Sequence, residues 1–183
     1  PPAGLSARHR RELEAAGVLM QLANLSGNRF LPERRVTAPV QIGDAITARL
    51  YDLAMGLADR VGLRRARQRL IAGAEGDVLE IGIGTGLNLP AYGADVSLHA
   101  IDPSTEALAI AARRADRLRR PVTLVTGDAA SLPYPDDSFD TVIGTFVLCS
   151  VGDVSSTLRE ARRVLRPGGT VRFLEHARSD DRR

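Results

Sequence analysis

The sequence predicts an α/β protein built on a doubly wound, mostly parallel sheet, and three observations support that prediction. From Gly73 onward, short apolar runs of strand length alternate with amphipathic stretches of helix length. The first run ends in a glycine-rich turn, and an acidic residue stands at or just after the end of each of the first three runs. Such alternation is typical of parallel strands joined by helices that cover both faces of a sheet.

Five strands are predicted after Gly73. They span 77–81, 96–102, 121–125, 139–144 and 170–175. Helices are expected between them near 87–92, 104–120 and 153–165. The last helix is followed by Arg166-Pro167-Gly168-Gly169, where a basic residue precedes proline and glycine stop signals. The order of elements therefore favours successive strand–helix–strand units.

The part of the chain before Gly73 is predicted to be helical and to form a lid. Apolar residues recur at three- and four-residue spacing within 6–25 and 42–60, and a short third helix is expected over 63–71. The predicted organisation is an N-terminal helical segment over residues 1–72 and an α/β core over residues 73–183.

Composition bounds the class of protein. The chain has 183 residues, 44% of them hydrophobic and 26% charged, which is typical of one globular domain and excludes wholesale disorder. No apolar run reaches the roughly 20 residues that a membrane-spanning helix needs. The single cysteine, Cys149, excludes an internal disulfide and a cysteine-based structural zinc site. A cytoplasmic location is expected.

The basic residues are unusual because all of them are arginine, whereas their number is ordinary. All 25 are arginine, yet the net charge is only +3. They occur in helical runs with alanine and leucine, as in 113–120, which indicates solvated helix faces and no nucleic-acid partner. The expected partner is a small-molecule acceptor. Peripheral membrane contact and a homodimer are both compatible with the sequence.

The glycine-rich turn carries the most specific signal. Residues 78–88 read VLEIGIGTGLN, so a strand runs into the spacing G-x-G-x-G. A dinucleotide pyrophosphate loop has G-x-G-x-x-G instead, and here Leu87 occupies the position of its third glycine. Glu80 stands two residues before Gly82. An acid beside bare turn amides suits a ligand with an amino-acid end better than a pyrophosphate.

Two further acids are predicted to meet this turn at one edge of the sheet. Asp102 ends the second strand, where a carboxylate can accept both ribose hydroxyls. Asp128 follows the third strand, where it can accept an adenine amino group while the Ala129 amide faces a ring nitrogen. Each acid alone could equally be a turn or cap residue, and Asp102 precedes Pro103-Ser104 at a helix start.

These segments together resemble the class I S-adenosylmethionine-dependent methyltransferases. The resemblance covers about residues 76–177 and rests on VLEIGIGTGLNLPAY, LHAIDPS, TGDAASLPYPDDSFDTVIGTFVLCSV and REARRVLRPGGTVRFLEH. The combination of D-x-x-x-L-P, D-x-S-F-D and R-V-L-R-P-G-G is similar to the methyltransferase type 11 and ubiquinone/menaquinone methyltransferase group. The segments at 147–151 and 175–176 look most like relatives that methylate small alkyl thiols.

The resemblance implies a Rossmann-like core that binds S-adenosylmethionine and releases S-adenosylhomocysteine. It assigns cofactor-binding roles to matching positions along the chain. Those positions are Tyr51, Glu80, Gly82, Gly84, Gly86, Asp102, Pro103, Ser104, Asp128, Ala129, Gly144 and Thr145. His176, which follows the fifth strand, is the candidate catalytic base, although a surface role is the alternative. No metal is implied.

The implied activity is methyl transfer to a small, hydrophobic acceptor that presents a thiol, a phenol or quinol, or an amine. Three alternatives remain at this point. A non-catalytic cofactor-binding protein would keep the same crevice. An RNA methyltransferase is disfavoured because 144–147 reads Gly-Thr-Phe-Val where an N-P-P-Y-like tetrad is expected. A nicotinamide oxidoreductase has the wrong glycine spacing.

One departure from the family concerns its last strands. Five strands are predicted here where the family fold has seven, so the C-terminal strands of that fold are expected to be missing and the sequence to be a fragment. Were the sequence complete, the fifth strand would be an open edge that is prone to pair with another chain.

Overall fold

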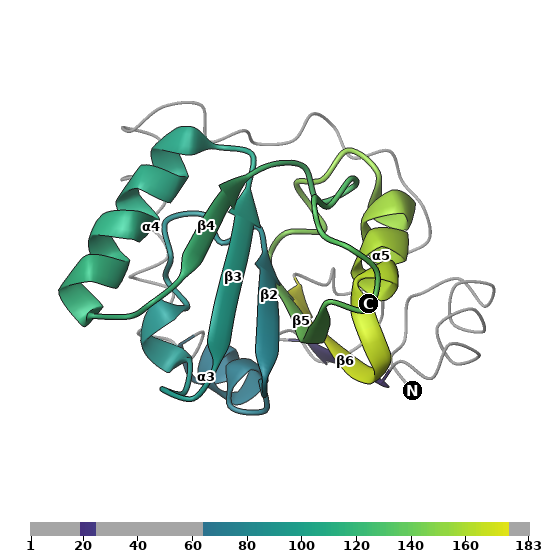
Figure 1. The fold of residues 1–183 in the computed structure, drawn as a ribbon, viewed down its shortest axis with the longest axis horizontal. Coiled ribbons are helices and arrows are strands. Elements are labelled where there is room, and N and C mark those ends of the chain that lie inside the picture. Colours follow the sequence, from purple (N-terminus) through teal and green to yellow (C-terminus); the bar gives the residue numbers. More distant parts are fainter. Residues whose placement is uncertain (1–18, 25–63, 176–183) are drawn as a thin grey trace, which may run out of the picture.

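The computed structural model describes residues 19–24 and 64–175 of the chain. Within these ranges, six strands form one sheet in the order β1-β6-β5-β2-β3-β4, and every neighbouring pair is parallel (Figure 1). The strands are β1 (Leu19–Asn24), β2 (Asp77–Ile81), β3 (Ser97–Asp102), β4 (Thr123–Thr126), β5 (Phe139–Thr145) and β6 (Leu165–Glu175). The helices are α3 (Arg64–Ile71), the 3₁₀ turn η2 (Leu89–Ala91), α4 (Thr105–Leu118) and α5 (Val154–Arg163).

The predicted α/β class and the five predicted core strands are confirmed. The largest boundary difference is in β6, which begins five residues early at Leu165. The pairing with β5 shifts between Phe139↔Leu165 and Thr141↔Thr170, so the Pro-Gly-Gly segment bulges out of the ladder. Gly168 has a φ of 83° there, a conformation that favours glycine. The Pro167-Gly168-Gly169 segment, which was predicted to end a helix, therefore forms a bulge inside β6.

The helical prediction for 6–25 is wrong at its end. Residues Leu19–Asn24 form β1, which pairs in parallel with β6 from Leu19↔Thr170 to Asn24↔Glu175. The unpaired backbone groups along β6 offer this short segment a ladder of hydrogen bonds, and tertiary pairing overrides a weak helical periodicity. The edge of β6 that would be open in a complete chain is thus covered by β1, and the described residues form a sheet of six strands where five were predicted. The division into a lid and a core at residue 72 stays a prediction.

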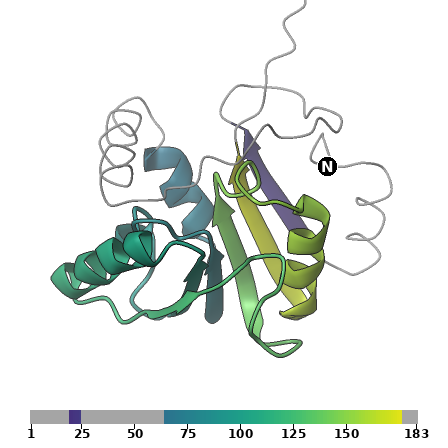
Figure 2. The ribbon, with the colours of Figure 1, turned by 90° about the horizontal axis from the view of Figure 1, so that it is seen from above.

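Alternation of side chains along the strands builds two apolar layers. One layer joins Val78, Leu98 and Ile143 to residues of α3, η2 and α4. The other joins Leu79, Val142 and Phe173 to residues of α5 and of the segment after β4. Figure 2 shows α3 and α4 on one side of the sheet and α5 on the other. The parallel sheet is thus covered on both faces, as its near-continuous apolar strands predict.

Polar side chains fix where the two long helices begin. Ser104 accepts a hydrogen bond from the amide of Ala107 and caps α4, and Asp153 accepts one from Ser156 and caps α5. Each satisfies an amide that the first helical turn leaves without a partner. The start of α4 directly after β3 places its N-terminus at the edge of the sheet where the strands end.

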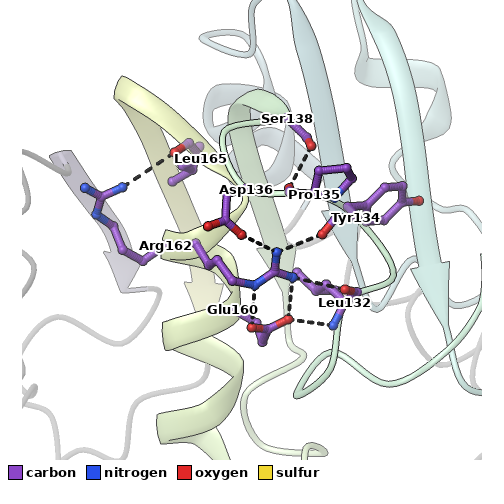
Figure 3. Close-up of polar contacts among 9 residues, drawn as sticks. Leu132, Tyr134, Pro135, Asp136, Ser138, Glu160, Arg162 and Leu165 are labelled. Carbon is purple, nitrogen blue, oxygen red and sulfur yellow. Dashed lines mark hydrogen bonds and ion pairs between the residues drawn. The ribbon is translucent and has the colours of Figure 1, made fainter.

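Arg163 at the end of α5 ties down the segment that follows β4. Its guanidinium donates to both carboxylate oxygens of Glu160, and also to Asp136 and to the carbonyls of Leu132 and Tyr134 (Figure 3). Glu160 in turn accepts the amide of Leu132 at 2.8 Å. This network anchors residues 132–136 on α5 and so fixes the far end of the segment that carries Asp128.

Among the described residues, no helix has the length and apolar character to cross a membrane.

Candidate functional site

The candidate site lies at the carboxyl ends of the parallel strands, where the direction of strand order reverses. From β2 the chain proceeds through β3 to β4 on one side, and it then returns to β5 and β6 on the other. Ligands of open α/β sheets bind in the crevice at such a switch point. The glycine-rich turn leaves β2 at this point, between the ends of β3 and β5.

Backbone hydrogen bonds to β3 hold the glycine turn in place. The amides of Gly82 and Ile83 donate to the carbonyl of Ile101. The amide of Gly84 donates to Oδ2 of Asp102 at 2.8 Å. Gly82, Gly84 and Gly86 have φ values of 68°, 54° and 79°, so all three adopt the left-handed conformation that favours glycine. The three glycines are therefore explained first by backbone geometry.

Only one of these glycines adjoins open space. A Cβ at Gly82 would lie 2.5 Å from Cγ2 of Val147, and a Cβ at Gly86 would lie 2.7 Å from Cδ1 of Leu89. At Gly144, a Cβ would lie 2.7 Å from Cγ1 of Val147. A Cβ at Gly84 would meet no atom of the described residues within 4 Å. Internal packing fills the space at the other glycines, so Gly84 is the position where a ligand can approach the backbone.

Glu80 lies inside the protein and not on the surface of the crevice. Its side chain is fully buried, and its two oxygens accept hydrogen bonds from Asn88 Nδ2 at 2.6 Å and from the Tyr92 hydroxyl at 2.9 Å. Burial raises the pKa of Glu80 to about 7, although both hydrogen bonds and the charge of Arg67 lower it. The carboxylate thus anchors the segment that follows the glycine turn, through Asn88 and Tyr92.

Asn88 joins the two strands that flank the crevice. Besides its bond to Glu80 of β2, its Nδ2 donates to the Thr145 hydroxyl of β5 at 2.9 Å. Its Oδ1 is buried and has no hydrogen-bond partner within residues 19–24 and 64–175. A buried acceptor without a partner is costly, and it is a natural place for a donor group of a ligand.

Asp102 and Ser104 form a second organised element beside the turn. Oδ1 of Asp102 accepts the amide of Ser104 at 2.9 Å while Oδ2 accepts that of Gly84. Burial raises the pKa of Asp102, and the two amides oppose that shift. Asp102 therefore joins the glycine turn to the start of α4. Ser104 caps that helix, and Pro103 beside it is exposed.

Asp128 lies at the same edge, in the turn after β4. Its Oδ1 accepts the amide of Ala130 at 2.8 Å, and its carbonyl accepts that of Ser131. The side chain of Asp128 is exposed, whereas Ala129 is buried in the layer under α5. The amide of Gly127 bonds to the carbonyl of Asp102, which brings this turn next to the end of β3.

The ends of β5 and β6 form the opposite wall. After Thr145 the chain turns at Phe146, and Glu175 at the end of β6 accepts the amides of Val147 and Leu148, each at 2.9 Å. Burial raises the pKa of Glu175 to about 7. Cys149, next in the turn, is exposed as a free thiol.

The structure thus brings most of the predicted residues to one edge and adds others. Tyr51 and His176 lie outside the described residues. Sequence reasoning missed Asn88, Tyr92 and Glu175. The rule that singled out acids at strand ends applies equally to Glu175. No sequence signal identifies Asn88 or Tyr92, because their roles depend on where η2 carries them relative to Glu80.

A family model for a methyltransferase domain matches residues 79–173, just over half of the chain. A phosphatidylethanolamine N-methyltransferase of Cereibacter sphaeroides is 37% identical over 72% of this chain and 65% of its own length. A human thiol S-methyltransferase is 38% identical over 58% of this chain and 46% of its own length. A ubiquinone/menaquinone biosynthesis C-methyltransferase of Paracoccus denitrificans is 49% identical over 36% of this chain and 24% of its own length.

Among solved structures, the YcgJ protein of Bacillus subtilis has a TM-score of 0.58 and 32% identity. The similarity covers 64% of this chain and 53% of that one. The chain spans just under two thirds of the length of the first of these relatives, and about half or less of the others.

Proposed function

Because this chain belongs to the methyltransferase domain family, we propose that it moves a methyl group from S-adenosylmethionine to a small, hydrophobic acceptor. The observation that supports the proposal best is the glycine turn at the switch point. There Gly84 adjoins open space while its amide is held by Asp102. This is a rigid, open backbone segment at the edge of the sheet where nucleoside ligands bind.

The residues present fit such a cofactor. The open space beside Gly84 allows the amino-acid end of S-adenosylmethionine to reach the backbone of the glycine turn. The buried Oδ1 of Asn88 lacks a donor, which an ammonium group supplies. Asp102 holds the ribose hydroxyls with the acceptor capacity that its two amide bonds leave free. Asp128 and Ala129, at the end of β4, are proposed to contact the adenine.

The chemistry proposed for this site is a direct displacement. S-adenosylmethionine supplies an electrophilic methyl carbon on a sulfonium. The acceptor atom forms a bond to that carbon as the carbon–sulfur bond breaks, which leaves a neutral thioether. An acceptor that carries a proton on the reacting atom must also release it, and His176 is the proposed base. The turn and the end of β5 align the two reactants, an effect worth about 7–11 kcal/mol in favourable cases.

The acceptor is proposed to be a thiol, a phenol or quinol, or an amine on an apolar molecule. The support comes from relatives named as a phosphatidylethanolamine N-methyltransferase, a thiol S-methyltransferase and a ubiquinone/menaquinone biosynthesis C-methyltransferase. The chemistry that these acceptors share is a polarisable or weakly basic nucleophile attached to an apolar body.

Calorimetric titration with S-adenosylhomocysteine tests cofactor binding. A panel of alkyl thiols, phenols, quinols and phosphatidylethanolamine vesicles with methyl-labelled cofactor tests transfer. We expect binding together with label in one acceptor class. Binding without transfer to any acceptor would favour the non-catalytic alternative, and no binding would contradict the proposal as a whole. Salt-dependent RNA binding with label in the RNA would favour the RNA methyltransferase instead.

A further inference from the structure

Glu175 stands at the end of β6, and its hydrogen bonds run to the turn after β5. One of its oxygens, Oε1, accepts two successive amides, those of Val147 and Leu148, at 2.9 Å each. The side chain is only 7% exposed. A buried carboxylate is costly unless donors surround it, and here the donors are the backbone of the turn that follows β5.

The turn that Glu175 holds begins with a strained residue. Phe146 has a φ of 55°, and its amide donates to the carbonyl of Leu174 at 2.8 Å. For a residue other than glycine, this conformation costs on the order of 1–3 kcal/mol and persists only where the surroundings enforce it. Ser150 and Val151 donate their amides to the carbonyl of Val147. Val147 is therefore fixed at both its amide and its carbonyl.

The side chain of Val147 connects this turn to the glycine turn. It is 5% exposed, and one of its methyl groups occupies the space that a Cβ would need at Gly82. The other methyl group shares the corresponding space at Gly144 with the ring of Phe173. Gly82 is the first glycine of the turn after β2, and Gly144 is near the end of β5. The ends of β2 and β5 lie side by side, because Ile81 pairs with Gly144 in the ladder. The side chain of Val147 packs on both ends, and we call it the Val147 wedge; Glu175 holds its backbone.

We propose that Glu175 is a positioning residue for methyl transfer, which acts by fixing Val147 between Gly82 and Gly144. This inference rests on the proposed function. The ladder between Ile81 and Gly144 sets the spacing of β2 and β5. The wedge packs on both strand ends and keeps the glycine turn from shifting relative to the end of β5, which holds the cofactor in place relative to the acceptor. A misplacement of 1 Å in such an arrangement costs about a hundredfold in rate.

Three variants and a control test the role of Glu175. Glu175→Leu removes both acceptor bonds, Glu175→Gln keeps one acceptor oxygen, and Val147→Ala shortens the wedge directly. Asp153→Ala is the control, because this exposed residue caps α5 through hydrogen bonds to Ser156 and the variant loses a cap of similar kind. Kinetics are measured below the lowest unfolding temperature, with whichever acceptor of the panel turns over fastest.

We expect kcat to fall at least tenfold in Glu175→Leu and in Val147→Ala. The dissociation constant of S-adenosylhomocysteine should stay within threefold, since Gly84 and Asp102 are untouched. Glu175→Gln should retain kcat within threefold, and Asp153→Ala should lose stability only. Equal kcat in Val147→Ala and the wild type, or equal impairment in Glu175→Gln and Glu175→Leu, would overturn the inference. Should Glu175→Leu not fold, Val147→Ala and Glu175→Gln still decide it.

Amide hydrogen exchange gives a readout that needs no acceptor. We expect Glu175→Leu to speed exchange at least tenfold both at 147–148 and at the glycine turn over 82–84, while Asp153→Ala leaves both segments unchanged. Faster exchange confined to 147–148 would show that the wedge does not reach the glycine turn, and it would overturn the proposal. A wild-type chain that binds no S-adenosylhomocysteine would contradict the proposed function instead.

Discussion

Gly84 and Gly82 differ in what surrounds them, so the same substitution should have different consequences at the two positions. In Gly84→Ala the new Cβ meets no atom of the part of the chain that the structure describes within 4 Å, but φ stays at 54°. The left-handed conformation costs an alanine about 1–2 kcal/mol. For a chain of this size that corresponds to a fall in Tm of about 2–8 °C. The Cβ also projects into the space proposed for the cofactor, so affinity should fall at least tenfold, or about 1.4 kcal/mol.

In Gly82→Ala, strain adds to a clash. The same conformational cost of about 1–2 kcal/mol applies. The new Cβ would also lie 2.5 Å from Cγ2 of Val147, closer than any real contact, and overpacking of this kind costs about 1–3 kcal/mol. The free energy of unfolding should therefore fall by about 2–5 kcal/mol, and Tm by about 4–20 °C. Cofactor affinity should fall less than in Gly84→Ala.

Thermal unfolding followed by circular dichroism measures Tm, and calorimetric titration with S-adenosylhomocysteine measures the affinity for the cofactor product. The two variants should therefore rank in opposite order in Tm and in affinity. Gly84→Ala must be the more stable variant and the weaker binder. If the Gly84 variant bound S-adenosylhomocysteine as tightly as the wild type, the ligand would not approach the turn at that glycine.

Three other predictions follow from the described contacts. Asp102→Ala removes the acceptor of the Gly84 amide and should weaken S-adenosylhomocysteine binding more than tenfold by calorimetry, with Asp102→Asn intermediate; unchanged affinity in a folded variant would remove Asp102 from the site. The pKa of Glu80 is raised from 4.5 to about 7, so its contribution to stability is full below pH 4.5 and is lost as pH rises through about 7. Denaturant titrations of the wild type at several pH values should show the free energy of unfolding fall by up to about 3 kcal/mol from this group between pH 4.5 and about 7. In Glu80→Gln the free energy of unfolding should depend less steeply on pH, and an equal pH dependence in the two proteins would refute the pKa shift. Arg163→Met should lower the free energy of unfolding in urea by about 1–3 kcal/mol, because half-buried charged hydrogen bonds to Glu160 and to two carbonyls are lost, and Arg163→Lys should lose less.

The arrangement of the core follows from local sequence. Short apolar runs between helical stretches predict parallel strands, and the spacing of Gly82, Gly84 and Gly86 after a strand predicts a ligand-binding turn. Parallel strands also bring their carboxyl ends to one edge by necessity, which is why Asp102 and Asp128 could be placed together without coordinates. The prediction for Thr145 rested instead on the resemblance to the methyltransferase family.

Only the tertiary structure decides which of these residues adjoin open space and which have that space occupied by other side chains. The motif treats Gly82, Gly84 and Gly86 alike, yet Val147 and Leu89 occupy the space beside two of them. Glu80 was expected among the residues around the ligand, which stays a prediction; the fold shows that its carboxylate is buried and bonded to Asn88 and Tyr92, at the two ends of η2. Such contacts join residues through folded segments whose paths no local pattern encodes.

The strand at Leu19–Asn24 shows the same limit at the level of secondary structure. Six residues with three leucine or methionine side chains are compatible with a helix or a strand, and local periodicity favoured the helix. The unpaired edge of β6, more than 140 residues away in sequence, decided for the strand. What the chain determines locally is which elements can form; what only the fold determines is which backbone groups and which empty spaces remain for them to fill.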